Sequence, residues 1–181
     1  MKAVLDACVL FPTVLREILL GVAAAGMYEP VFSDRILREW TRATAKLGPA
    51  AQAVAEGEAT LVRVAFPRAM IGEKPGIEAA LMLPDPNDVH VLATAIAGHA
   101  DAIVTFNAQD FPGHLLAAEG VARRDPDGFL WELWSRHPAT VAGVIEVVRS
   151  KAESLSGQPM PLKALLKRSR LHRLSKALHA P

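Results

Sequence analysis

A helix that leads into a short buried strand is predicted by Asp85-Pro-Asn-Asp88-Val-His90-Val-Leu-Ala-Thr-Ala-Ile-Ala-Gly98 and the following Asp101-Ala-Ile-Val-Thr105. The start of this helix is well marked, because Asp suits the N-cap, Pro the first helical position and a second Asp the third. The helix is expected to end near Gly98 and the strand to run up to Thr105. Helices that alternate with short strands are typical of a parallel sheet covered by helices.

The same alternation extends in both directions along the chain. Further strands are predicted at 2–6, 31–32 and 121–123. Further helices are predicted at 13–25, 34–47, 49–60, near 76–83, at 111–120 and at 126–136. Apolar residues at helical spacing mark the first of these helices, and Ser33 is a suitable N-cap for the second. We therefore expect an α/β fold with a central, mainly parallel sheet flanked by helices.

No strand signal remains beyond Pro138. One amphipathic helix is predicted at 140–155, and Ser156-Gly-Gln-Pro159 is a linker to the C-terminal tail. The chain is therefore expected to consist of an α/β domain at residues 1–136 and a helical C-terminal extension at residues 137–181.

The composition excludes several classes of protein. The chain has 181 residues, of which 51% are hydrophobic and 22% are charged, so a disordered or fibrous protein is excluded. Cys8 is the only cysteine, which excludes an intramolecular disulfide and a cysteine-based zinc site. The longest early uncharged stretch, at 18–28, has about half the length that a membrane span needs. We expect a soluble cytoplasmic protein with no membrane association.

The net charge of +1 conceals an uneven distribution along the chain. The last 23 residues contain no acidic residue and six basic ones, which are Lys163, Lys167, Arg168, Arg170, Arg173 and Lys176. The first 158 residues therefore carry a net charge of −5. The chain is an acidic body with a basic tail.

The leucines of the tail form two groups. On a helical wheel, Leu162, Leu165 and Leu166 lie roughly opposite the leucines at 171, 174 and 178. Either the tail helix breaks near Ser169-Arg170, or it is packed on two sides. Three roles remain open: a packed helix with a solvated basic face, an RNA-binding patch, or a docking surface for an acidic partner or a second subunit. Membrane binding is disfavoured because the leucines form no continuous apolar face.

Acidic residues lie where the predicted strands and helices begin or end. Asp6 ends the first strand, and the carboxyl ends of parallel strands are where ligands bind in open sheets. Asp85 and Asp88 begin the helix described above. A later strand end is followed by three oxygen-bearing side chains, Thr105, Asn107 and Asp110. The alternative for the aspartates is helix or turn capping, and the alternative for the loop is a plain turn.

Glu39 lies three residues after Ile36, next to the apolar face that Ile36, Leu37 and Trp40 are expected to form. A carboxylate in that position is costly unless it is paired or bound to a metal ion. The alternative is a solvated glutamate that pairs with Arg35 or Arg42.

Together these acids would lie at one edge of one sheet. Clustered carboxylates repel one another unless a cation lies among them. Oxygen ligands without cysteine suit Mg²⁺ or Mn²⁺. Such ions polarise a phosphate and activate water, as the hydrolysis of a phosphodiester requires.

The sequence resembles the PIN-domain ribonucleases, and among them the VapC-like toxins of bacterial type II toxin–antitoxin pairs. The resemblance covers residues 1–135 and is carried by Val4-Leu-Asp6, Ser33-Asp-Arg-Ile-Leu-Arg-Glu39-Trp40, Leu83-Pro-Asp85-Pro-Asn-Asp88-Val-His-Val-Leu-Ala93 and Ile103-Val-Thr105-Phe-Asn107-Ala-Gln-Asp110-Phe-Pro112. It implies a three-layer PIN-like fold and a Mg²⁺- or Mn²⁺-dependent endoribonuclease. It also implies a homodimer and a small cognate antitoxin that blocks the acidic cleft.

The resemblance also implies which residues form the site. The family's first three acids fall on Asp6, Glu39 and Asp88, with Asp85 close by. The position of the fourth acid holds Asn107, which offers oxygen without charge, so a second ion should bind less tightly. Asp110 is expected to complete the catalytic and metal-binding set, which is then Asp6, Glu39, Asp88 and Asp110. Thr105 would hold a ligand or a water molecule through its hydroxyl.

Alternatives exist for the role of His90 and for the function of the whole protein. His90, two residues after Asp88, is expected to be a structural hydrogen-bonding residue rather than a phosphate contact or proton donor. A haloacid-dehalogenase-like phosphatase with Asp6 as nucleophile would need an acid two residues later, and that position holds Cys8. A catalytically weak PIN-like module that binds RNA or a partner is kept open by Asn107.

Overall fold

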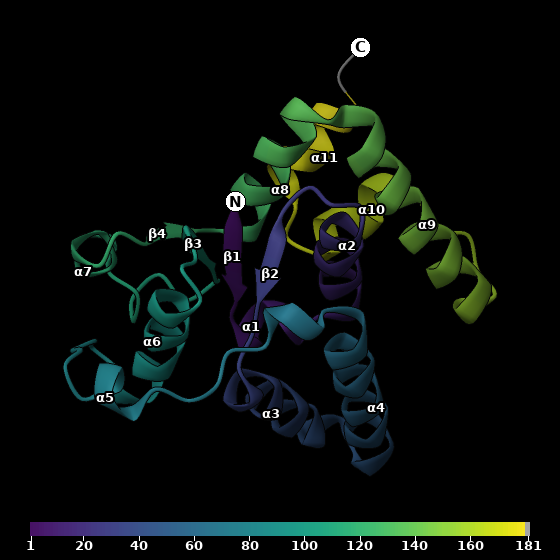
Figure 1. Ribbon diagram of the computed structural model, residues 1–181. Coiled ribbons are helices and arrows are strands. Elements are labelled where there is room, and N and C mark those ends of the chain that lie inside the picture. The colour runs from purple at the N-terminus through teal and green to yellow at the C-terminus, as the bar shows by residue number, and fades with distance from the viewer. Residues whose placement is uncertain (180–181) are drawn as a thin grey trace. The chain divides into compact units, whose positions relative to one another are not determined.

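A four-stranded parallel sheet organises the N-terminal two-thirds of the chain. The computed structural model describes residues 1–179. The strands are β1 (Lys2–Leu5), β2 (Glu29–Val31), β3 (Ala102–Val104) and β4 (Ala122–Arg124). They pair in the order β2-β1-β3-β4, and every pairing is parallel (Figure 1). The α/β prediction is therefore confirmed.

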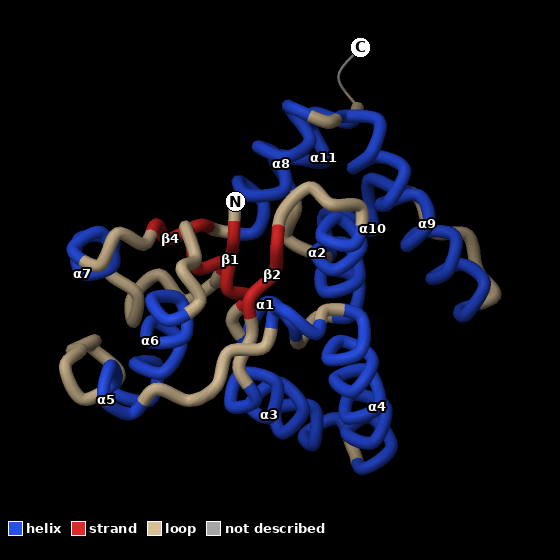
Figure 2. Tube along the Cα trace, viewed as in Figure 1, coloured by secondary structure: helices blue, strands red, loops and turns tan. Residues whose placement is uncertain are grey.

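The burial of each strand explains which types of residue it contains. Ala3, Val4 and Leu5 of β1 and all of β3 are buried, as expected for central strands with both faces covered. β4 lies at the edge and exposes two arginines, which protect an open edge from pairing with another chain. The strands are short, and Figure 2 shows them as red segments among longer helices.

The residue contacts divide the chain into two compact units. The first unit consists of Met1–Phe11 and Tyr28–Arg124, and the second of Pro12–Met27 and the residues from Asp125 onward. The boundary expected at residue 136 between a domain and an extension stays a prediction.

Helices cover the sheet of the first unit. They are α1 (Ala7–Leu10), α3 (Asp34–Ala43), α4 (Pro49–Ala65), α5 (Pro75–Glu78), α6 (Val89–Ala97) and α7 (Gly113–Ala118). Three short 3₁₀ turns, η1 (Thr44–Leu47), η2 (Pro67–Ala69) and η3 (Pro86–Asp88), join or precede them. α6 packs against β1 and β3, α7 against β4, and α3 against α1 and α4.

The described part of the second unit is helical throughout. It contains α2 (Thr13–Ala24), α8 (Pro126–Arg136), α9 (Pro138–Ser156), α10 (Leu162–Arg168) and α11 (His172–Leu178). α2 packs on α9, and α8 packs on both α9 and α11. α2 and α9 approach closely at Gly21, where an added Cβ would lie 2.7 Å from Cγ1 of Val144. The predicted helical C-terminal region is confirmed.

Two local predictions have clear outcomes. The helix expected near 76–83 is wrong beyond one turn, since only α5 forms there. None of its residues is buried, although α5 contacts α6, so little burial is available to stabilise a longer helix. Of the two alternatives for the tail, the structure shows the break near Ser169-Arg170, where Arg170 has a φ of 62° between α10 and α11.

None of the helices in the described part of the chain is long and apolar enough to cross a membrane.

Candidate metal centre

The candidate site lies at the carboxyl edge of the sheet, where β1 and β3 end side by side. Leu5 and Val104 are register partners, so the next residues, Asp6 and Thr105, are neighbours. The hydroxyl of Thr105 donates to Oδ2 of Asp6 at 2.6 Å, and both side chains are buried. The topology therefore brings together two predicted site residues that are far apart in sequence.

Cys8 is a second donor to Asp6. Its Sγ lies 3.0 Å from Oδ2 of Asp6 and 3.3 Å from Oγ1 of Thr105. Burial, and then the charge of Asp6, raise the pKa of the Cys8 thiol to about 12. The thiol is therefore protonated at neutral pH and donates to the carboxylate. In the sequence, Cys8 argued against a disulfide, a cysteine-based zinc site and a phosphatase, but its contact with Asp6 was not predicted.

The start of α6 supplies two more carboxylates, and they have different local roles. Oδ1 of Asp85 accepts the backbone N–H of Asn87 at 2.8 Å and so caps η3. Asp88 makes no capping hydrogen bond, so its carboxylate is available to the site. Asp85 therefore uses one carboxylate oxygen as a cap, whereas Asp88 has no capping role.

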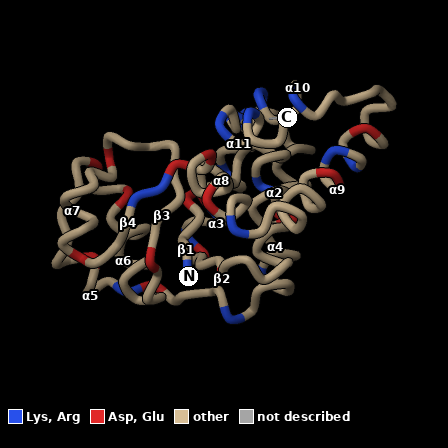
Figure 3. Tube along the Cα trace, turned by 90° about the horizontal axis from the view of Figure 1, so that it is seen from above, with Lys and Arg blue, Asp and Glu red and all other residues tan. Residues whose placement is uncertain are grey.

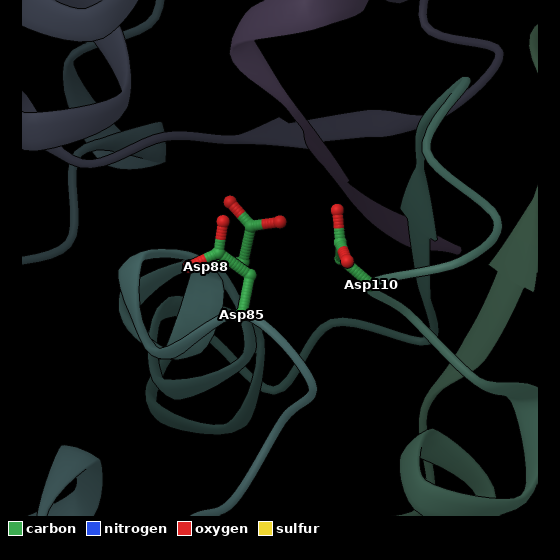
Figure 4. Close-up of side chains that lie close together, drawn as sticks. All are labelled: Asp85, Asp88 and Asp110. Atoms are coloured by element: carbon green, nitrogen blue, oxygen red, sulfur yellow. The ribbon is translucent and has the colours of Figure 1, made fainter.

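Asp110 comes from the loop after β3 and completes a carboxylate cluster. One carboxylate oxygen each from Asp85, Asp88 and Asp110 lies within 4.8 Å of the other two. Figure 4 shows the two carboxylates at the start of α6 facing that of Asp110 across a small gap. We call these three residues the aspartate cluster.

Asn107 connects two members of the aspartate cluster. Its Nδ2 donates to Oδ2 of Asp110 at 2.6 Å and to Oδ2 of Asp88 at 3.2 Å. Its Oδ1 accepts the backbone N–H of Asp110 at 3.4 Å, and its own N–H donates to Oγ1 of Thr105. The amide nitrogen of Asn107 thus faces the carboxylates, while the role of its oxygen as a ligand stays a prediction.

Four other acids lie close enough to Asp88 to affect its pKa. The pKa of Asp88 is raised to about 6, first by burial and then by the charges of Asp6, Asp85, Asp110 and Glu39. These are the acids that the sequence placed at one edge of the sheet. Mutual repulsion of this kind disfavours the fully ionised cluster in the absence of a cation.

Glu39 reaches the same region from α3. Ile36, Leu37 and Trp40 are fully buried, so the expected apolar face is present beside it. Oε1 of Glu39 lies 3.3 Å from Nε of Arg35, which confirms the pairing that the sequence left open. Glu39 is therefore an ion-paired residue that also acts electrostatically on Asp88.

His90 is buried next to Glu39. Its Nε2 lies 2.9 Å from Oε1 of Glu39, and its side chain is only 2% exposed. Among the described residues, neither ring nitrogen has a hydrogen-bond partner, although Nε2 lies close to the Glu39 carboxylate. The hydrogen bond expected of a structural histidine is therefore not formed.

The donor set fits a hard divalent cation. Three carboxylates lie within mutual reach of one ion, Asp6 lies in the same field, and the neighbouring sulfur is a protonated thiol. Mg²⁺ and Mn²⁺ prefer such oxygen ligands. The residues present could therefore hold a metal ion.

Comparison with known families found one matching family model. A family model described as the PIN domain matches residues 2–109. The match spans Asp6, Glu39, Asp88 and Asn107 and ends one residue before Asp110. The searches of curated proteins and of solved structures found no match.

Proposed function

Because this chain belongs to the PIN-domain family, we propose that it is a Mg²⁺- or Mn²⁺-dependent endoribonuclease. The observation that carries the proposal is the aspartate cluster. The pKa of its member Asp88 is raised by burial and then by the charges of Asp85 and Asp110 and of the nearby Asp6 and Glu39. An acidic cluster of this kind is stabilised by a divalent cation and is poorly suited to bind RNA without one.

Asp85, Asp88 and Asp110 would hold the ion, with Asp6 and Glu39 close enough to contribute charge. When bound, the ion supplies polarisation of a phosphate and activation of water. The other residues position the ligands. Thr105 and Cys8 fix one carboxylate oxygen of Asp6, and Asn107 fixes Asp88 relative to Asp110.

The motif resemblance further supports a role as the toxin of a type II toxin–antitoxin pair. In this proposal the protein is a VapC-like cytoplasmic homodimer. A small cognate antitoxin blocks the acidic site, and a basic side chain of the antitoxin suits the charge of the aspartate cluster. A short reading frame that encodes the antitoxin is then expected next to this one. Co-expression with that antitoxin should relieve growth inhibition, and failure of that rescue would count against the toxin role.

Asn107 favours a second candidate function. Its amide already joins Asp88 and Asp110 without an ion, which would suit a catalytically weak PIN-like module that binds RNA or a partner. The two candidates differ in whether the site takes up metal.

Metal uptake can be measured directly with Mn²⁺ by electron paramagnetic resonance. Asp88→Asn should weaken Mn²⁺ binding by more than about tenfold. Loss of a residue that only hydrogen-bonds to a metal ligand already lowers metal affinity by about that factor. Glu119→Gln is the matched control, since Glu119 is exposed and lies outside the site. Unchanged Mn²⁺ binding in Asp88→Asn would favour the metal-free module.

A further inference from the structure

The second unit carries a concentrated positive charge at its C-terminal helices. Its residues include ten basic and six acidic ones, a net charge of +4, whereas the first unit has a net charge of −3. Figure 3 shows blue segments gathering along α10 and α11. We call the six basic residues there the basic tail: Lys163, Lys167, Arg168, Arg170, Arg173 and Lys176.

Packing directs the basic tail outward. The leucines at 165, 166, 171 and 174 are buried, and α10 and α11 pack on α9 and α8. The turn at Arg170 resolves the opposed leucine groups, because each short helix can bury its own side. All six basic residues of the tail are exposed.

The cations of the tail differ from the other cations of the same unit. Arg136 pairs with Glu132 at 2.7 Å, and Lys151 pairs with Glu17 at 2.6 Å. Arg149 likewise pairs with two glutamates. By contrast, four tail cations have no carboxylate partner in the part of the chain that the structure describes: Lys163, Lys167, Arg168 and Lys176.

One cation of the tail, Arg173, stacks on an aromatic side chain. The guanidinium of Arg173 lies 3.6 Å from the centroid of the Trp131 ring. Asp127 fixes the start of α11 by accepting the backbone N–H groups of Arg173 and Leu174 at 2.7 and 2.9 Å. Arg173 is an exposed residue, and the face of its guanidinium turned away from Trp131 offers a plane on which a nucleobase can stack.

We propose that α10 and α11 form a binding surface for single-stranded RNA, which contacts phosphates through the unpaired cations and a base through Arg173. The surface extends the proposed ribonuclease function by giving the RNA a second site on the same chain. The exposed residues of α10 and α11 favour RNA over an acidic protein as the ligand. Protein interfaces rely on apolar or aromatic anchors at a core depleted of charge, and here the leucines are already buried.

The test is the salt dependence of RNA binding by the full chain in EDTA, where cleavage is absent. The probe is a labelled single-stranded RNA of about 16 nucleotides. Each lost phosphate contact should reduce the slope of log K against log salt by about 0.7, so four lost contacts should reduce it by about 3. The tail variant removes four charges: Lys163→Gln, Lys167→Gln, Arg168→Gln and Lys176→Gln.

A matched variant removes four exposed cations of the first unit: Arg42→Gln, Lys46→Gln, Arg68→Gln and Lys74→Gln. This variant has the same net charge as the tail variant, and its slope should change by less. An unchanged slope in the tail variant, or an equal loss in both variants, overturns the proposal. Displacement of the RNA by polyglutamate at equal charge would also overturn it and favour an acidic protein partner.

Arg173→Lys tests the stacking step separately. It keeps the charge, so the salt slope should be unchanged while the affinity falls about fivefold or more. Unchanged affinity would remove stacking from the proposal. RNA binding is measured without metal, so the two proposals can fail separately. Absence of cleavage with retained RNA binding would contradict only the ribonuclease function. Cleavage together with an unchanged salt slope in the tail variant would contradict only the RNA-binding surface.

Discussion

At the scale of single residues, the site depends on neutral donors that hold charged carboxylates in place. Thr105 and Cys8 donate to one oxygen of Asp6, and Asn107 donates to both Asp88 and Asp110. These contacts fix the orientation of the carboxylates without neutralising them, so the negative field remains available for a cation.

Removal of the Thr105 hydroxyl tests this positioning role. Thr105→Val should reduce kcat/KM for RNA cleavage by about 10- to 100-fold, because a hydrogen bond to a charged group contributes about 1.5–3 kcal/mol. Thr105→Ser keeps the donor and should retain most of the activity. Equal activity in the valine and wild-type proteins would show that the orientation of Asp6 is set by other contacts.

The raised pKa of Asp88 predicts how the metal-free protein responds to pH. The folded protein binds this proton up to about pH 6, whereas an ordinary aspartate loses it near pH 3.8. In this window the folded state holds more protons than the unfolded state, so stability in EDTA should fall as pH rises from about 4 to 6.

Urea unfolding in EDTA across that range measures the effect. Asp88→Asn should flatten this part of the pH profile, while Glu119→Gln should leave it unchanged. Mg²⁺ should bind more weakly below about pH 6, because it competes with the Asp88 proton. A profile for Asp88→Asn that matches the wild type would assign the titration to another group.

The residue types of the site were readable from the sequence, but several contacts were not. The acids stand out at the ends of predicted elements, and the structure places Asp6, Glu39, Asp85, Asp88 and Asp110 in one field. The thiol contact of Cys8 and the orientation of the Asn107 amide depend on side-chain rotamers. A sequence pattern does not specify rotamers, so these contacts could only come from the structure.

At the scale of elements, the close approach of α2 and α9 depends on a single glycine. Gly21→Ala should destabilise the fold by about 1–3 kcal/mol, because the new methyl would meet Val144 at 2.7 Å in a packed interface. Gly57 in α4 is a control, since its added Cβ meets nothing within 4 Å. Gly57→Ala should stabilise by about 0.5–1 kcal/mol through helix propensity.

Thermal unfolding of both variants checks this pair of expectations. Gly21→Ala combined with Val144→Ala should recover part of the loss, because the smaller side chain makes room for the methyl. Equal stability of Gly21→Ala and wild type would mean that α2 and α9 can move apart without loss of stability.

Element types were predicted better than element partners. The apolar spacing of 13–25 showed that one face of a helix is buried, but it did not show that α9 covers that face. The same limit applies near residues 76–83, where a helix was predicted and only the one turn of α5 forms, with none of its residues buried. Periodicity reports burial, whereas the choice of partner depends on contacts distant in sequence.

At the scale of the whole molecule, charge is divided between the two units. The first unit, with a net charge of −3, contains the aspartate cluster, and the second, with a net charge of +4, contains the basic tail. The sequence showed this division as an acidic body and a basic tail. The structure adds that α2 belongs with the basic unit and that the tail cations are exposed.

In the proposed function, the aspartate cluster cuts RNA with the help of a divalent cation. The most direct test of this function is cleavage of single-stranded RNA in Mg²⁺ and in EDTA by the wild type, Asp6→Asn, Asp88→Asn and the control Glu119→Gln. We predict cleavage only in Mg²⁺, at equal rates for the wild type and the control, and none above background for the two aspartate variants. Cleavage in EDTA, or full activity in Asp88→Asn, would contradict the claim.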